Sequence, residues 1–128
     1  MKVYVSLPIS KYNLGERKMY AYIVKGKLLA NHEIDEVVTP FDVCSEPDKL
    51  YGYYMGKDIE ALFTCDAICL CPFWIESKGC VTELLVAANN DKRVMEFDEY
   101  DNEKALEEIF KPNTKKFCMS ALASLPEW

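Results

Sequence analysis

The chain has 128 residues, 50% of them hydrophobic and 28% charged, and its 15 basic and 21 acidic side chains give a net charge of −6. This length supports one domain with a hydrophobic core rather than two, and so apolar a composition excludes disorder as the dominant state. The acidic balance excludes the long-range positive field that attracts nucleic-acid polymers. A local basic site for a small anion is still compatible with it.

No apolar run approaches the roughly 18 residues that a membrane span needs, and the amino terminus lacks the pattern of a secretory signal. We therefore expect a cytoplasmic protein without a membrane partner. Cysteine in a reducing compartment is commonly a small buried hydrophobe, and this chain has six: Cys44, Cys65, Cys69, Cys71, Cys80 and Cys118. Zinc is the alternative, but the spacings are C-x-x-x-C and C-x-C rather than C-x-x-C, and His32 is the only histidine. We expect neither a metal nor a cofactor.

The chain opens with a strand followed by a long helix. Residues 2–6 form a short β-branched and aromatic run that ends before a proline, which is typical of a strand. Residues 10–31 are predicted to be helical, with Ser10 or Asn13 as the cap. The apolar residues that recur there at helical spacing are Leu14, Met19, Ile23, Leu28 and Ala30.

A second strand is expected over residues 36–39, where the run stops at Pro40. Residues 41–53 hold turn formers and predict a mobile loop. Residues 54–64 then predict a helix. Its core-facing residues are expected to be Met55, Ile59, Leu62 and Phe63.

The remaining elements alternate between strand and helix. Residues 67–71 are apolar at every position, which favours a central parallel strand covered on both faces. A helix over 77–89 and a strand over 93–97 follow. The acidic residues 98–108 predict a surface helix, and residues 111–128 either dock on the domain or contact another subunit.

This alternation predicts one α/β domain over residues 1–110, with a doubly wound, mainly parallel sheet of four to five strands as in Rossmann or flavodoxin-like folds. In such sheets ligands bind outside the carboxyl ends of the strands. The loops to search are therefore residues 6–11, 39–44 and 72–79.

Glu83 is the one charged residue of the helical segment 80–88. It lies opposite that segment's large apolar residues and between Cys80 and Ala87, whose small side chains leave room beside it. A carboxylate in such surroundings is expected to have a raised pKa, and unusual carboxylates concentrate at functional sites. The alternative is a glutamate at a subunit contact.

Other polar residues near this helix have both a structural and a functional interpretation. Asp58 shares a helix face with Tyr54 and could be simply solvated, while Asp66, before a buried strand, is typical of a turn. Ser77 is a helix cap whose hydroxyl could also hold an anion. Trp74, like its neighbour Phe73, could stack on a flat ring or belong to the core.

Together these residues resemble the nucleoside 2-deoxyribosyltransferase-like superfamily, which includes deoxynucleoside-monophosphate N-glycosidases. The similarity covers roughly residues 1–97. It rests on the opening strand with Tyr4 and Pro8 and on a spaced set of residues: Tyr54, Asp58, Asp66, Ser77, Gly79 and Glu83.

The resemblance implies a role for each matching residue. Glu83 matches the nucleophile that attacks the anomeric carbon, Tyr4 the tyrosine that orients it, and Asp58 the aspartate that contacts the leaving base. Ser77 stands where monophosphate glycosidases carry serine and where nucleoside transferases carry aspartate. The expected substrate contacts are Ser6, Pro8, Lys11, Trp74, Ser77 and Gly79, with Lys11, Arg17 and Lys78 as candidate phosphate partners.

The resemblance therefore implies hydrolysis of the N-glycosidic bond of a 2′-deoxynucleoside 5′-monophosphate, because a hydroxyl at a helix N-terminus attracts the phosphate that a carboxylate would repel. Base exchange between deoxynucleosides and a non-catalytic nucleotide-binding module are the alternatives. The expected partner is a small nucleotide or nucleoside. A homodimer or higher homo-oligomer is expected by analogy and from the apolar C-terminal segment.

Overall fold

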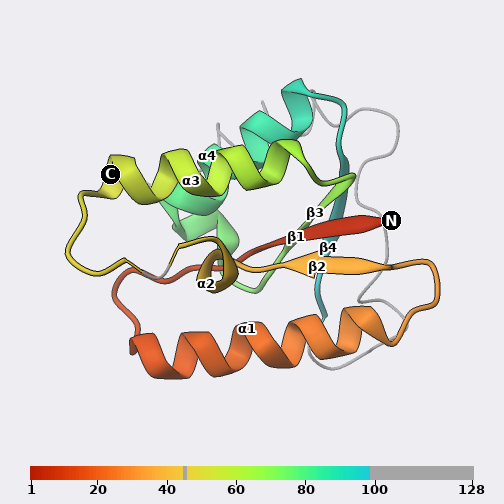
Figure 1. The fold of residues 1–128 in the computed structure, drawn as a ribbon, viewed down its shortest axis with the longest axis horizontal. Coiled ribbons are helices and arrows are strands. Elements are labelled where there is room, and N and C mark those ends of the chain that lie inside the picture. The colour runs from red at the N-terminus through yellow and green to blue at the C-terminus, as the bar shows by residue number, and fades with distance from the viewer. Residues whose placement is uncertain (45, 99–128) are drawn as a thin grey trace.

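The computed structural model describes residues 1–44 and 46–98, which form a parallel sheet flanked by helices (Figure 1). Its strands are β1 (Lys2–Ser6), β2 (Glu36–Val38), β3 (Ala67–Leu70) and β4 (Arg93–Glu96). They are ordered β2-β1-β3-β4, and every neighbouring pair is parallel. The predicted doubly wound α/β fold is confirmed, with four strands in the part of the chain described.

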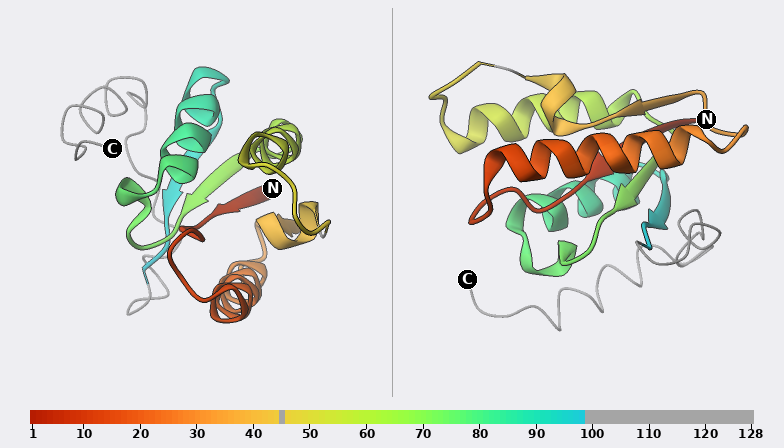
Figure 2. Two further views of the ribbon diagram at one scale, coloured as in Figure 1. Left: turned by 90° about the vertical axis from the view of Figure 1, so that its left-hand side faces the viewer. Right: turned by 90° about the horizontal axis from the view of Figure 1, so that it is seen from below.

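Helices cover both faces of this sheet. Helix α1 (Leu14–Leu29) lies against one face, and α3 (Tyr51–Phe63) and α4 (Lys78–Asn89) lie side by side against the other (Figures 1 and 2). Two shorter elements, α2 (Pro40–Val43) and the 3-10 turn η1 (Trp74–Glu76), complete the order. The sheet therefore separates two hydrophobic layers.

The alternation of side chains along β1 places its residues in different layers. Val3 and Val5 pack with α1, whereas Tyr4 packs with residues of α3 and α4. Because successive side chains of a strand point to opposite faces, Ser6 faces the same side as Tyr4. The predicted all-buried central strand is confirmed, since every residue of β3 is buried.

Helix α1 was located correctly from the sequence, but the face it buries was not. Asn13 caps it by accepting a hydrogen bond from the Glu16 amide at 3.0 Å. Its buried residues are Ala21, Val24 and Leu28, of which only Leu28 was among the apolar residues named from the sequence. Several larger apolar residues that indicated the helix instead face solvent, with exposed fractions of 62% for Leu14, 67% for Met19 and 49% for Ile23.

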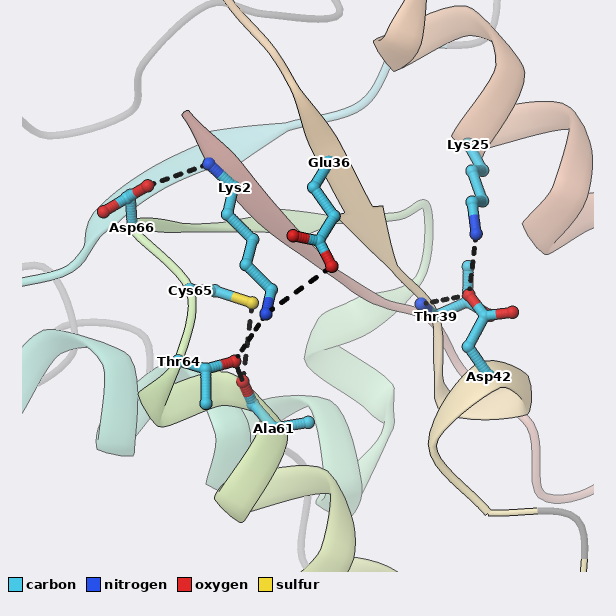
Figure 3. Close-up of polar contacts among 9 residues, drawn as sticks. All are labelled: Lys2, Lys25, Glu36, Thr39, Asp42, Ala61, Thr64, Cys65 and Asp66. Carbon is cyan, nitrogen blue, oxygen red and sulfur yellow. Dashed lines mark hydrogen bonds and ion pairs between the residues drawn. The ribbon is translucent and has the colours of Figure 1, made fainter.

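The expected loop over residues 41–53 is partly helical. Pro40 begins α2, because its fixed φ angle suits the first helical position. The Asp42 carboxylate accepts hydrogen bonds from the Thr39 amide at 3.0 Å and the Thr39 hydroxyl at 3.1 Å. Lys25 of α1 reaches the same oxygen at 3.1 Å (Figure 3). These bonds attach α2 to the domain.

Helix α3 begins at Tyr51, three residues earlier than predicted. The phenol oxygen of Tyr54 donates to the Glu46 carbonyl at 2.8 Å and accepts from the Lys49 amide at 3.0 Å, so this side chain holds the preceding segment. Phe63 was expected in the core and is 51% exposed. It follows buried Leu62 by about 100° around the helix and therefore points outward.

Asp66 lies at the amino-terminal edge of the sheet. Its carboxylate accepts a hydrogen bond from the Lys2 amide at 2.8 Å, and the Lys2 ammonium lies 2.9 Å from the Thr64 hydroxyl and 3.7 Å from Glu36 (Figure 3). The turn interpretation of Asp66 is therefore correct. This cluster joins the starts of three strands at the edge opposite to the one where ligands are expected.

Several expectations fall outside the described residues. The predicted helix at 98–108 lies there almost entirely, as do the segment 111–128 and Cys118. Over residues 1–44 and 46–98, no helix is long and apolar enough to cross a membrane. The five cysteines in these ranges are all free thiols, and no cluster of three metal-ligating side chains occurs among the same residues.

Candidate active site

The candidate site lies where α4 passes the carboxyl end of β1. Glu83 on the second turn of α4 points at this strand and is only 4% exposed. Tyr4 and Ser6, two residues apart on β1, face it and are both fully buried. Asp58 on α3 lies close enough for its charge to act on Glu83.

Both oxygens of Glu83 are held by hydroxyl groups. The Tyr4 phenol donates to Oε2 at 2.5 Å, and the Ser6 hydroxyl donates to Oε1 at 2.7 Å. A carboxylate bound at both oxygens has a fixed orientation, and both bonds favour its charged form. The predicted Tyr4–Glu83 contact is present in the structure, whereas the Ser6–Glu83 contact was not anticipated.

The pKa of the Glu83 carboxyl group is set by opposing effects. Burial raises the pKa of Glu83 to about 8; the hydrogen bonds from Tyr4 and Ser6 oppose that rise, and the neighbouring Asp58 adds to it. The expectation of a raised pKa therefore agrees with the geometry. Glu83 can hold or release a proton near neutral pH.

Asp58 and Tyr4 complete the electrostatics of the site. Burial also raises the pKa of Asp58, to about 7. Burial, together with the charge of Glu83, raises the pKa of Tyr4 well above its usual value. The phenol therefore stays a hydrogen-bond donor near neutral pH, where the two carboxyl groups titrate.

The first turn of α4 forms the side of the site next to Glu83. Ser77 caps the helix, and its hydroxyl accepts from the Cys80 amide at 3.3 Å. The buried Cys80 thiol hydrogen-bonds with the hydroxyls of Ser77 and Ser6, and burial raises its pKa to about 12. At Gly79, a Cβ atom would make ordinary contacts with Tyr51 and Met55 of α3, so α3 lies close to this turn.

Tyr51 is a residue of the site that the sequence analysis missed. A Cβ atom on Gly79 would lie 3.6 Å from the Tyr51 phenol oxygen, which contacts the Met55 sulfur at 3.3 Å. Burial, with the charges of Glu83 and Asp58, raises the pKa of this phenol. The sequence does contain a pattern that points to Tyr51, because it shares a helical i, i+4, i+7 spacing with Met55 and Asp58 and so lies on the same face of the helix.

Other predicted contacts lie elsewhere. Trp74 is buried with Tyr4 in the core, so the core interpretation holds for it, while Phe73 is 64% exposed in the left-handed region at φ 66°. Pro8 is buried directly after β1. Lys11 is exposed, also with a positive φ of 72°. Tyr54 points to the preceding segment rather than to Asp58.

Arg17, a candidate phosphate partner, packs between two aromatic rings. Its guanidinium lies 4.6 Å from the ring centre of Tyr12 and 4.9 Å from that of Tyr20. This cation–π packing on α1 is on the face of the sheet opposite Glu83. Neither it nor Lys11 contacts the carboxyl pair.

The arrangement can support nucleophilic and acid–base chemistry. It combines an oriented buried carboxylate, a second carboxyl group that titrates near neutrality and two hydroxyl donors that hold the first. Groups of this kind, with pKa values moved toward the working pH, are typical of catalytic sites.

Comparison with known proteins identifies the family. Residues 1–96 match a family described as a domain of unknown function, DUF4406. The chain belongs to the DUF4406 family. No match was found among curated proteins.

This DUF4406 chain is also similar to a solved structure, a 2-deoxyribosyltransferase from Leishmania mexicana. The two share 20% sequence identity and a TM-score of 0.53, and the similarity covers 97% of this chain and 99% of the other. At this identity the likeness establishes a shared fold. The expected resemblance to the deoxyribosyltransferase-like superfamily is thus confirmed for the fold.

The buried carboxyl group leads to a prediction about stability. Glu83 ionises near its ordinary 4.5 when the chain is unfolded but near 8 when folded. The stability that protonated Glu83 contributes is therefore fully present below pH 4.5 and is lost as the pH rises through about 8. Glu83→Gln should remove this loss and stabilise the protein at pH 8.5 by about 1–3 kcal/mol, with little change at pH 5.

Urea unfolding at a series of pH values measures this effect. Glu60→Gln, which replaces an exposed carboxylate on α3, serves as the control and should follow the wild type. A Glu83→Gln curve parallel to the wild-type curve would show that Glu83 does not have a raised pKa.

Proposed function

We propose that this DUF4406 protein cleaves the N-glycosidic bond of 2′-deoxynucleoside 5′-monophosphates, releasing the free base. The observation that carries the proposal is the buried Glu83 carboxylate, held at both oxygens by Tyr4 and Ser6 and accompanied by Asp58. Burying a carboxyl group away from water costs stability. Its retention beside a second carboxyl group is explained by chemistry rather than by packing.

In the first step, one Glu83 oxygen attacks the anomeric carbon of the deoxyribose. A carbon–oxygen bond forms, and the electron pair of the carbon–nitrogen bond moves to the base nitrogen. Protonated Asp58 supplies the proton with which the base leaves. This is the covalent, retaining route of carboxylate-based glycosidases.

In the second step, water replaces the enzyme on the sugar. Asp58, now a carboxylate, accepts a proton from water as the water oxygen bonds to the anomeric carbon. The carbon–oxygen bond to Glu83 breaks, and the carboxylate is regenerated with overall retention. The absence of a 2′-hydroxyl makes positive charge on the sugar easier to develop, which suits a site without further acids.

The first step requires the carboxyl pair to hold one proton, on Asp58. With pKa values of about 7 for Asp58 and about 8 for Glu83, the pair is singly protonated near neutral pH; its proton lies mainly on Glu83, and the reactive form with the proton on Asp58 is the minor one. A doubly protonated pair would lack the charged nucleophile, and a fully deprotonated pair would lack the acid. Activity should therefore decline on both sides of neutrality.

The choice of a monophosphate rests on Ser77 and the start of α4. The Ser77 hydroxyl and the positive end of the α4 dipole favour a phosphate. Base exchange would use the same intermediate, with a second base in place of water. A non-catalytic nucleotide-binding module would use the same surfaces without bond cleavage. Self-association stays a prediction.

A substrate panel tests the proposal. The protein is incubated with the four common deoxynucleotides and deoxynucleosides, and free base is followed by chromatography. We expect base release from at least one monophosphate, and Glu83→Gln should reduce it by at least about 1,000-fold because the nucleophile is lost.

The products separate the alternatives. Free sugar phosphate indicates hydrolysis, and a new nucleoside or nucleotide after adding a second base indicates exchange. Ligand-induced thermal stabilisation without turnover, in both wild type and Glu83→Gln, would leave only the binding module. Equal base release by wild type and Glu83→Gln would contradict the role of Glu83.

Ser77→Asp tests the substrate class. Aspartate caps helices as well as serine does, so the fold should be retained. Its charge should repel the phosphate and lower kcat/KM for the monophosphate by about 10-fold or more. The value for the matching nucleoside should stay the same or rise. Equal losses on both substrates would place the phosphate elsewhere.

A further inference from the structure

Ser6 stands out because its hydroxyl faces the carboxylate rather than an open surface. The side chain is fully buried at the end of β1, and its oxygen lies 2.7 Å from Glu83 Oε1. Tyr4 binds the other oxygen from the same face of the same strand. No oxygen of Ser6 is therefore exposed to a ligand, which argues against the substrate contact expected from the sequence.

The direction of the Ser6 hydrogen bond follows from proton counting. A hydroxyl has one proton, and a carboxylate is a far stronger acceptor than a thiol. Ser6 therefore donates to Glu83. The Cys80 thiol, which also hydrogen-bonds with Ser6, keeps its proton because burial raises its pKa to about 12.

We propose that Ser6 is a positioning residue that, together with Tyr4, orients the Glu83 carboxylate and stabilises its negative charge, so that the proton of the pair can move to Asp58. This inference rests on the proposed function, because only the tautomer with Glu83 charged and Asp58 protonated can form the glycosyl intermediate. Ser6 acts through the nucleophile and does not touch the substrate.

One hydrogen bond is enough to control this balance. The pKa values of the two carboxyl groups, about 7 and about 8, differ by roughly one unit. That difference corresponds to about a tenfold ratio in favour of the tautomer with the proton on Glu83, and a hydrogen bond to a charged group has an effect of at least this size. Removing Ser6 should therefore make the reactive tautomer, with the proton on Asp58, rarer still.

The groups that face Glu83 come from three elements. Each of them interacts electrostatically with Glu83, so the experiment must separate the effect of Ser6 from theirs. These groups are Tyr4 from β1, Tyr51 and Asp58 from α3, and Cys80 from α4. The Asp58→Asn background removes the second carboxyl group. Any titration of the site near neutrality then belongs to Glu83 alone.

The test compares Ser6→Ala and Ser6→Cys with the parent chain, in the wild-type and Asp58→Asn backgrounds. The Glu83 carboxyl carbon is titrated by NMR after 13C-glutamate labelling, with Glu83→Gln to assign the signal. We expect the Glu83 pKa to rise by about half a unit or more for Ser6→Ala, and by less for Ser6→Cys, which keeps a weak donor. In the Asp58-containing proteins, kcat should fall about 10-fold with KM nearly unchanged.

Thr39→Val provides the matched control, since it also removes a buried hydroxyl at a strand end but one that binds Asp42. It should lower stability without moving the Glu83 titration. If Ser6→Ala leaves both the titration and kcat unchanged, the positioning role is wrong. If the Glu83 titration moves but the wild type releases no base from any substrate, the contact is upheld and the glycosidase proposal fails.

Discussion

The structure depends on one buried carboxylate whose two oxygens are held by two hydroxyls of a single strand. Glu83 would be costly to bury alone, and Tyr4 and Ser6 offset part of that cost by donating to Oε2 and Oε1. The alternation of β1 makes this pairing possible, because residues two apart face the same side while Val5 between them packs against α1. Strand geometry thus determines the orientation of the Glu83 carboxylate.

Much of the architecture could be predicted from local patterns. The all-apolar run before Pro72 indicated a central strand, and the uncharged surroundings of Glu83 indicated a carboxylate turned inward. Both features depend on residues close together in the sequence. The pairing of Tyr4 with Glu83 spans 79 residues, and it was reached through a family resemblance rather than from local spacing.

Other features could not be predicted because tertiary packing decides them. On α1 the large Leu14, Met19 and Ile23 lie outside, while the small Ala21 and Val24 allow the helix to approach the sheet. Helix α2 is joined to α1 by Lys25, which reaches Asp42 from a distant part of the sequence. Ser6 was assigned to the substrate because its loop position was visible in the sequence, whereas its contact with α4 was not. Tyr51 was missed because the helix was expected to begin at residue 54, whereas α3 begins at Tyr51.

The most direct test of the account is to identify the residue that carries the sugar. The protein is mixed with a deoxynucleotide substrate, quenched in acid within the first turnovers and digested, and the peptides are analysed by mass spectrometry. The account predicts a deoxyribosyl-phosphate adduct on the peptide containing Glu83, localised to that side chain. Turnover of the substrate with the adduct on a residue other than Glu83 would contradict the account.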